Sequence, residues 1–221
     1  MIANVATHPE YRGRGIARAL TLAALDHARF HNAASTWLQV RDDNPSAIHI
    51  YKNNGFKECV RRTSWYSGPN FEETALAPGI EVGKRRPEHW IQQRDWLKRI
   101  YPSDLEWNIP FDWNLFRMDI LGGIYRFLML ENLQHWSVVH NSELKGVLSW
   151  KHVGGYTDPM WMAIPEQVDE EAIRGLLNIT RKHIGQLQPL SLNYPADVAV
   201  DALRHSGFYP HQTLIWMEYK F

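Results

Sequence analysis

Residues 5–17 read Val5-Ala6-Thr7-His8-Pro9-Glu10-Tyr11-Arg12-Gly13-Arg14-Gly15-Ile16-Ala17, and this stretch decides the fold. The apolar run at residues 2–6 predicts a strand, and the alanine- and leucine-rich segment after Gly15 predicts a helix. Glycines between a strand and a helix let backbone N–H groups approach an anion, and the helix start adds partial positive charge. Arg12 and Arg14 supply charged donors. The layout therefore predicts a phosphate-binding loop.

Two common phosphate-binding patterns are excluded. The P-loop pattern ends in Gly-Lys-Ser/Thr, and the dinucleotide pattern needs three glycines at other spacings; the stretch has neither. A structural alternative is a flexible basic turn in front of an ordinary helix. In the helix, four small or apolar residues recur at steps of three and four and are expected to share the buried face: Ala17, Leu20, Ala24 and Ala28.

Composition bounds the class of protein. The 221 residues suit one large or two small domains, and 24 basic residues balance 24 acidic ones, so no overall charge favours nucleic acid or an anionic membrane. The single cysteine, Cys59, fits a reducing compartment. No apolar run has membrane-spanning length, and no signal peptide is apparent. We expect a cytoplasmic protein that binds neither membrane nor nucleic acid.

The hexamer at residues 12–17 resembles the acetyl-CoA-binding motif of the GNAT acyltransferase superfamily, Gln/Arg-x-x-Gly-x-Gly/Ala. A second motif strengthens the resemblance: residues 44–56 follow the pattern Asn-x-x-Ala-x-x-x-Tyr-x-x-x-Gly-Phe of that family's later helix. Asn44 and Pro45 suit the start of this helix, and Gly55 suits its end. The two motifs, in family order, cover residues 2 to about 66.

The resemblance implies a site. The residues that match positions binding acetyl-CoA are Val5, Arg12, Gly13, Arg14, Gly15, Ile16, Ala17 and Asn44. By family analogy a backbone N–H near Val5 stabilises the oxyanion of the attacked thioester, and Tyr51 protonates the departing thiolate. The structural alternative for Tyr51 is a tyrosine that packs on the sheet. No base is assigned: residues 2–6 hold no carboxylate, so a water relay or an upstream residue would serve. The paired His27 and His31 are interpreted as surface residues, and no metal is expected.

The resemblance also departs from the family, whose domain has two helices and three strands before the strand expected at residues 2–6. This predicts a fragment of a longer protein, a mis-assigned start, or replacement by other elements. Residues 71–79, rich in proline and glycine, are interpreted as a linker. The fold expected is α/β (α+β), a GNAT-type mixed sheet flanked by helices, with a partial first domain at residues 1–70 and a complete but degenerate second domain at residues 80–221.

The second domain is inferred from an internal repeat. Gly207 and Phe208 follow Gly55 and Phe56 by 152 residues, and the predicted order of strands and helices recurs. The chemistry does not recur. The counterpart of residues 12–15 is Val168-Asp169-Glu170-Glu171, in which carboxylates stabilise a helix start but repel a pyrophosphate. We therefore expect no CoA binding there, and we interpret the tryptophans after residue 85 as packing residues.

The function predicted is transfer of an acetyl group from acetyl-CoA, as co-substrate, to a primary amine by direct attack. The acceptor is a small molecule or a peptide, and a homodimer is compatible with the sequence. The alternative is a non-catalytic pseudo-acetyltransferase, or a truncated fragment, that acts as a binding or regulatory module.

Overall fold

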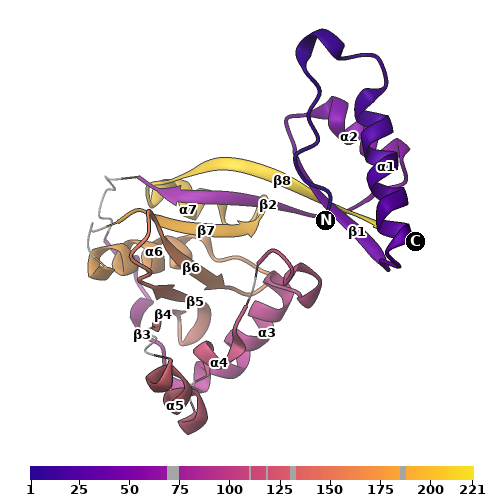
Figure 1. The fold of residues 1–221 in the computed structure, drawn as a ribbon. Coiled ribbons are helices and arrows are strands. Elements are labelled where there is room, and N and C mark those ends of the chain that lie inside the picture. Colours follow the sequence, from indigo (N-terminus) through magenta and orange to yellow (C-terminus); the bar gives the residue numbers. More distant parts are fainter. Residues whose placement is uncertain (69–74, 110, 118, 130–132, 185–187) are drawn as a thin grey trace. The chain divides into compact units, whose positions relative to one another are not determined.

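The computed structural model describes residues 1–68, 75–109, 111–117, 119–129, 133–184 and 188–221 (Figure 1). The chain divides into two compact units: Met1–Thr63 with Gln212–Phe221, and Ser64–His211. The predicted linker at 71–79 lies partly outside the described residues.

The first unit is built on a short run of elements: α1 (Ile16–Phe30), β1 (Ser35–Arg41), α2 (Pro45–Asn53), the start of β2 (Lys57–Ser67) and the end of β8 (Phe208–Lys220). A single turn of 3-10 helix, η1 (Pro9–Tyr11), precedes them. Helices α1 and α2 contact each other (Figure 1). The core of this unit is small, and its buried apolar residues are Leu25, Leu38, Val40, Tyr51, Phe56, Ile215 and Met217.

Strand β8 supplies part of this core from the far end of the chain. It pairs antiparallel with β1 from Ser35↔Lys220 to Arg41↔Leu214. Alternate β1 residues, Thr36, Leu38 and Val40, are buried, as the two-residue period of a half-buried strand requires. The last strand of the chain therefore supplies Ile215 and Met217, two of the seven buried apolar residues of this core.

The second unit holds the remaining elements: β3 (Ile80–Lys84), η2 (Pro87–His89), α3 (Trp90–Ile100), η3 (Ser103–Leu105), α4 (Trp113–Phe116), α5 (Ile120–Leu128), β4 (Leu133–His140), β5 (Glu143–Lys151), β6 (Asp158–Ala163), α6 (Glu170–Ile184), β7 (Leu190–Pro195) and α7 (Val200–His205). Strands β4 and β5 form a hairpin, and Asn141 and Ser142 both take positive φ in its turn.

Helix α6 packs on β3, β4 and β5. A Cβ at Gly146 of β5 would lie only 2.7 Å from the Ile173 side chain, so the absence of a side chain there lets the helix approach the sheet. The inward side of α6 carries apolar residues, which include Ile173 and Leu177, and these are buried. Trp136 is buried in this core, and several other tryptophans pack against it, as expected: Trp90, Trp96, Trp113, Trp150 and Trp161.

The eight strands follow the order β1-β8-β2-β7-β6-β5-β4-β3, which makes a mixed sheet flanked by helices, as the sequence predicts. The repeat explains the order. The run β1, α2, β2 recurs as β7, α7, β8, and the helix in each run is followed by a glycine with positive φ, Gly55 or Gly207. Each run's last strand lies beside the other run's first strand: β8 beside β1, and β2 beside β7.

Because of this exchange of strands, the boundaries of the two compact units differ from those of the predicted domains at residues 1–70 and 80–221. Residues 212–221 belong to the first unit, and the second unit begins at Ser64. The domain boundaries 1–70 and 80–221 stay a prediction about the repeat, which the compact units do not test.

Two local expectations are wrong. Residues 2–6 form no strand: Ile2 donates one backbone bond to the Trp37 oxygen (2.8 Å), and Asn4 takes a φ of 58° that interrupts the extended run. On α1 the buried residues are Thr21 and Leu25, whereas Leu20 is 47% exposed. The buried stripe is therefore displaced by one residue from the position of Leu20, toward Thr21.

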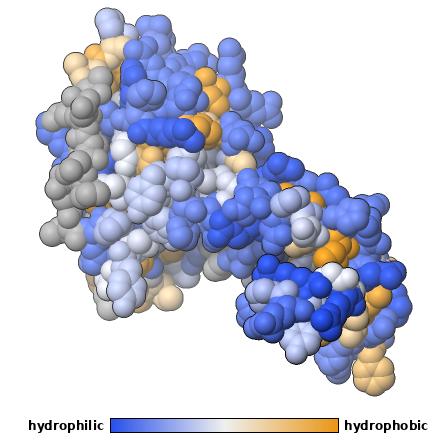
Figure 2. All heavy atoms as spheres, turned by 90° about the horizontal axis from the view of Figure 1, so that it is seen from above, coloured by the Kyte–Doolittle hydropathy of each residue, from blue (hydrophilic) through white to orange (hydrophobic). Residues whose placement is uncertain are grey.

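Of the helices described, none combines the length and apolar character needed to cross a bilayer. Among the described residues no group of three or more His, Cys, Asp or Glu side chains is placed to hold a metal ion. His27 and His31 are exposed, with ring centroids 4.5 Å apart. Figure 2 shows a face on which hydrophilic residues predominate.

A polar network is buried in the second unit. Arg85, 5% exposed, donates to Gln93 Oε1 and to the Phe116 oxygen (2.9 Å). Because arginine only donates, Gln93 turns its amino group to Ser149 Oγ (3.1 Å), which lies 2.7 Å from His135 Nδ1. Burial, with a contribution from Arg126, lowers the pKa of Arg85 to about 9. Burial, with repulsion from Arg85 and Arg126, holds the pKa of His135 well below 6.5.

We predict that His135 makes the second unit less stable in acid. The unfolded chain takes up a proton on this histidine near pH 6.5 and the folded chain does not, so stability falls as the pH drops below 6.5 toward the folded pKa. His135→Gln should reduce the slope of unfolding free energy against pH between pH 7 and 5, measured by urea titration of tryptophan fluorescence. The exposed His205→Gln should keep the wild-type slope. A full slope in His135→Gln would contradict the prediction.

We also predict that the first unit depends on β8. Ile215 is 1% exposed in its core, so Ile215→Ala should cost about 2–5 kcal/mol of stability and speed hydrogen exchange at the amides of β1. Tyr209→Ala, at an exposed position of the same strand within the second unit, should cost under about 1 kcal/mol. Unchanged exchange in β1 of the Ile215 variant would show that β8 does not complete this core.

Candidate functional site

The loop before α1 needs glycine for its conformation. Gly13 and Gly15 both take a φ of 76°, in the left-handed backbone region that residues with a Cβ rarely adopt. A Cβ at either position would meet nothing within 4 Å. The constraint is therefore the backbone conformation, and the space in front of these glycines is open.

Helix α1 begins at this open space. Gly15 is its N-cap, and no side chain caps the helix start. The first N–H groups of a helix have no acceptor within it, and the first bond along this helix runs from Ala19 N to the Gly15 oxygen (3.0 Å). The N–H groups of Gly15, Ile16, Ala17 and Arg18 are thus left to an external acceptor, and together they carry the helix's partial positive charge.

Helix α2 begins on the same cleft but is capped. The Asn44 side-chain oxygen accepts from Ala47 N at 3.1 Å, and Pro45 occupies the first helical position, as predicted. The amide oxygen of Asn44 is therefore engaged in the cap, and its amino group is the part of the side chain left for a ligand.

One cleft of about 1370 Å³ is lined by the first residues of both α1 and α2. Seven of the predicted binding residues line it: Val5, Arg12, Gly13, Gly15, Ile16, Ala17 and Asn44. The described residues that line it include Arg12 and Arg18 and no aspartate or glutamate, so the cleft suits an anion. A volume of this size is sufficient for an extended nucleotide-like ligand.

Arg14 and Tyr51 do not appear among the lining residues. The Arg14 guanidinium donates to the Glu10 oxygen (3.4 Å) and lies 5.1 Å from the centre of the Tyr11 ring. Arg12, in contrast, lines the cleft while its Nε donates to the Thr7 oxygen (3.3 Å). The roles given to Arg14 and Tyr51 stay predictions.

Tyr51 is a core residue of the first unit. Its side chain is buried and packs edge-on against Phe56, with ring centroids 6.1 Å apart. Burial raises the pKa of its phenol above 10, so the hydroxyl keeps its proton at neutral pH. The packing role and a proton-donor role are compatible, since a donor must be protonated when it acts.

Sequence reasoning missed one wall of the cleft. Ser46, His49 and Asn53 line it from α2, and the Asn53 amide lies 2.8 Å from His49 Nε2. Their spacing of three and four residues was a readable signal for one helix face. The signal was overlooked because the motif residues Ala47 and Tyr51 lie on a neighbouring face of the same helix.

The corresponding helix start in the second unit is closed by carboxylates. Asp169 Oδ1 caps α6 by accepting from Ala172 N (3.0 Å), and its other oxygen lies 2.7 Å from His140 Nδ1. Glu170 accepts from Ala202 N at 2.7 Å. Protein carboxylates thus occupy the positive end of this helix, in contrast to the bare start of α1.

Comparison with known proteins points to one family. Residues 1–56 match the model of the acetyltransferase (GNAT) family. The [ribosomal protein bS18]-alanine N-acetyltransferase of Escherichia coli K12 is 32% identical over 79 residues, which are 36% of this chain and 53% of that protein. The streptothricin acetyltransferase of Streptomyces lavendulae is 39% identical over 67 residues, 30% of this chain and 35% of that protein. The chain thus spans about half the length, or less, of these relatives.

Structural similarity to solved proteins extends over nearly the whole chain. A GCN5-related N-acetyltransferase from Sphaerobacter thermophilus has a TM-score of 0.54 at 14% identity, over 97% of this chain and 70% of that one. A tandem GNAT protein from the clavulanic acid biosynthesis pathway has a TM-score of 0.50 at 15% identity, over 97% of this chain and 73% of that one. Residues 1–56 are therefore similar to the GNAT family, and the chain as a whole has the fold of the solved GNAT proteins.

Proposed function

We propose that the chain is an N-acyltransferase that moves an acetyl group from acetyl-CoA to a primary amine. One observation carries the proposal: a bare helix start, two glycines of positive φ and two arginines line a single cleft that no carboxylate of the described lining shares. The family match over residues 1–56 supports the same site.

The first part of the proposal concerns binding. The N–H groups of residues 13–18 and the guanidinium of Arg12 hold the pyrophosphate of the donor, and the Asn44 amino group contacts its arm. One molecule of donor is expected for each chain, because the start of α6 is already neutralised by Asp169 and Glu170.

The second part concerns chemistry. The amine attacks the thioester carbonyl, the oxygen of that carbonyl gains charge, and the C–S bond breaks. A backbone N–H near Val5 stabilises the charged oxygen, and Tyr51 transfers its phenolic proton to the leaving sulfur. Burial raises the pKa of the Tyr51 phenol, so the group is protonated at neutral pH, as a proton donor must be. The proton of the amine leaves through a water relay or another group.

The acceptor class follows from the relatives. One relative acts on an alanine of ribosomal protein bS18 and another on streptothricin, so a peptide amine and a small-molecule amine are both represented. We therefore propose a primary amine of either kind as acceptor.

A second candidate is a binding module without turnover. It is favoured by two observations: Tyr51 is absent from the cleft lining, and residues 1–8 form no strand to carry the Val5 N–H. The two candidates share the donor site and differ only in the chemical step.

The donor site is tested by Gly15→Glu. The substitution forces a side chain onto a φ of 76° and places a carboxylate at the helix start, so CoA affinity measured by calorimetry should fall at least tenfold. Gly83→Glu is the matched control, because Gly83 lies on an exposed strand of the second unit with open space before it. Equal affinities in the two variants would remove the assignment.

The chemical step is tested by Tyr51→Phe. Loss of the hydroxyl should lower kcat by roughly ten- to ten-thousand-fold while CoA affinity stays near that of the wild type. Tyr209→Phe, an exposed tyrosine outside the first unit, should keep the wild-type rate. If Tyr51→Phe keeps the wild-type kcat, Tyr51 is only a packing residue. If the wild-type chain binds CoA but acetylates no amine, the binding module without turnover is favoured.

A further inference from the structure

Two polar side chains of helix α2 form a pair that lines the cleft. His49 and Asn53 lie four residues apart, so they stand one above the other on the same helix face. The Asn53 amide nitrogen lies 2.8 Å from His49 Nε2. Both side chains are exposed, and the binding roles proposed above for the loop before α1 and for Asn44 do not involve them.

The bond within the pair determines which nitrogen of His49 is left for a ligand. An amide nitrogen only donates, so His49 Nε2 accepts, and the proton of the neutral ring is on Nδ1. In the described part of the chain, Nδ1 donates to no acceptor. A second proton on the ring would leave Nδ1 a donor and would add a positive charge. The pair thus presents to the cleft an N–H donor whose ring is held by Asn53.

Two other exposed helix histidines show a different arrangement. His183 on α6 and His205 on α7 each have Nδ1 2.8 Å from the backbone oxygen four residues earlier, that of Ile179 and Asp201 respectively. In both residues Nδ1 is therefore engaged by the histidine's own helix. The ring of His49 is held instead through Nε2 from the following turn, so its Nδ1 stays available to a ligand.

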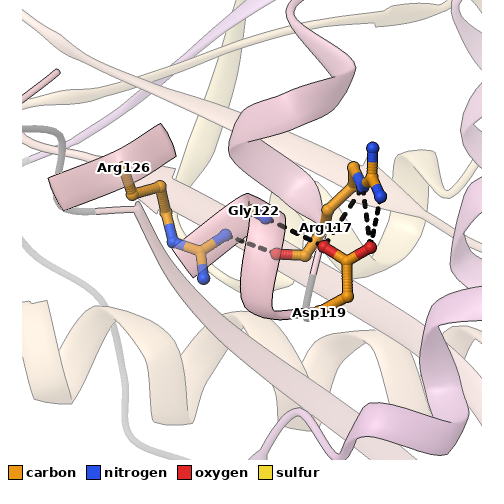
Figure 3. A network of polar contacts seen from close by, with 4 residues as sticks. All are labelled: Arg117, Asp119, Gly122 and Arg126. Carbon is orange, nitrogen blue, oxygen red and sulfur yellow. Dashed lines mark hydrogen bonds and ion pairs between the residues drawn. The ribbon is translucent and has the colours of Figure 1, made fainter. Parts of the chain in front are cut away.

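The polar groups around α5 also differ from this pair, because they bind one another. Asp119 accepts from Gly122 N (2.8 Å) and from the Arg117 guanidinium (3.1 Å), as Figure 3 shows. Arg126 donates to the Arg117 oxygen. A phosphate at α5 would compete with these acceptors for the same donors, whereas at His49 Nδ1 it meets no such competitor among the described residues.

The position of the pair on α2 suits the nucleotide end of CoA. Each helical residue turns by about 100°, so His49 and Asn53 each lie about 200° around the helix from Tyr51. Tyr51 faces the core and is proposed to act at the thioester, whereas the pair faces the cleft. The pair also lies about 7 to 14 Å along the helix from Asn44, which is proposed to hold the arm. With the thioester, arm and pyrophosphate assigned elsewhere, the nucleotide remains for the pair.

The chemistry of the nucleotide selects one group. The nucleotide of CoA carries a phosphate on its ribose 3′ oxygen, and a phosphate accepts hydrogen bonds through several charged oxygens. Arg12 and Arg18 line the same cleft, and its described lining residues include no aspartate or glutamate that would repel this group. A donor in a positive cleft favours the phosphate over the neutral adenine ring.

We propose that His49, held in position by Asn53, donates from Nδ1 to the 3′-phosphate of CoA and so gives the cleft a preference for CoA over 3′-dephospho-CoA. His49 is thus a specificity-determining residue, and Asn53 is a positioning residue. The inference rests on the proposed function, because it assigns a further contact to the same donor site.

The test compares CoA with 3′-dephospho-CoA by calorimetry on the full chain. The wild type should bind CoA about three- to thirtyfold more tightly, which is the effect of one exposed hydrogen bond to a charged group. His49→Ala should lower the affinity for CoA by that factor and leave the affinity for 3′-dephospho-CoA unchanged. Asn53→Leu should lose part of the preference, because the ring is then free to turn. His49→Lys should retain a preference, since an ammonium group also binds phosphate.

His205→Ala is the matched control, because this exposed helix histidine lies outside the cleft; the variant should keep the wild-type preference. Unchanged binding of 3′-dephospho-CoA shows that the His49→Ala variant is folded. Full preference in Asn53→Leu would remove the positioning role. The proposal is overturned if the wild type binds both ligands equally, if His49→Ala keeps its preference, or if His49→Ala loses both ligands alike.

These outcomes are distinct from a failure of the proposed function. A wild type that binds both ligands equally, and loses both in Gly15→Glu, would retain the donor site and overturn only the role of His49. A wild type that binds neither ligand would overturn the donor site as well. A preference that is lost in Arg18→Ala and kept in His49→Ala would assign the 3′-phosphate to the α1 side of the cleft and would also overturn the proposal.

Discussion

The pairing of β1 with β8 is the interaction on which the first unit depends. Residues 1–63 alone offer two helices, β1 and part of β2, and their buried apolar residues are few. A chain segment of this size is marginal unless something else covers its core. Ile215 and Met217 arrive from the last strand and complete the cluster around Leu38 and Val40. Ile215 and Met217 pair with Val40 and Leu38, so the unit that holds the cleft is completed by a distant part of the chain.

The repeat shows how one backbone arrangement serves two purposes. Helices α1 and α6 occupy equivalent places in the element order, and each presents unpaired N–H groups at its start. At α1 the loop supplies glycines and no cap, so the N–H groups remain for a ligand. At α6 the loop supplies Asp169, whose carboxylate satisfies Ala172 N and offsets the helix dipole. The difference between an uncapped and a capped helix start thus resides in a few loop residues.

Sequence reasoning was sufficient wherever the determining interactions are local. The Asn44 cap and the glycine at Gly55 that ends the same helix each depend on neighbours within a few positions, and the structure confirms them. It failed where a distant partner decides. Residues 2–6 look like a strand, yet only one backbone bond to Trp37 fixes them. The exchange of β2 and β8 between repeats depends on contacts that no local pattern encodes.

The candidate site also combines features set by local sequence with features set by distant parts of the chain. Anion binding requires backbone conformation at Gly13 and Gly15 and a free helix start, all of which lie within six residues of sequence. Proton transfer requires a group from a second element, and Tyr51 is positioned by the core that β8 completes rather than by its own motif. Burial gives this phenol a raised pKa and at the same time restricts its access to the cleft. Binding can therefore persist under changes that remove chemistry, which is the physical reason that the two proposed functions, acyltransferase and binding module, share one donor site.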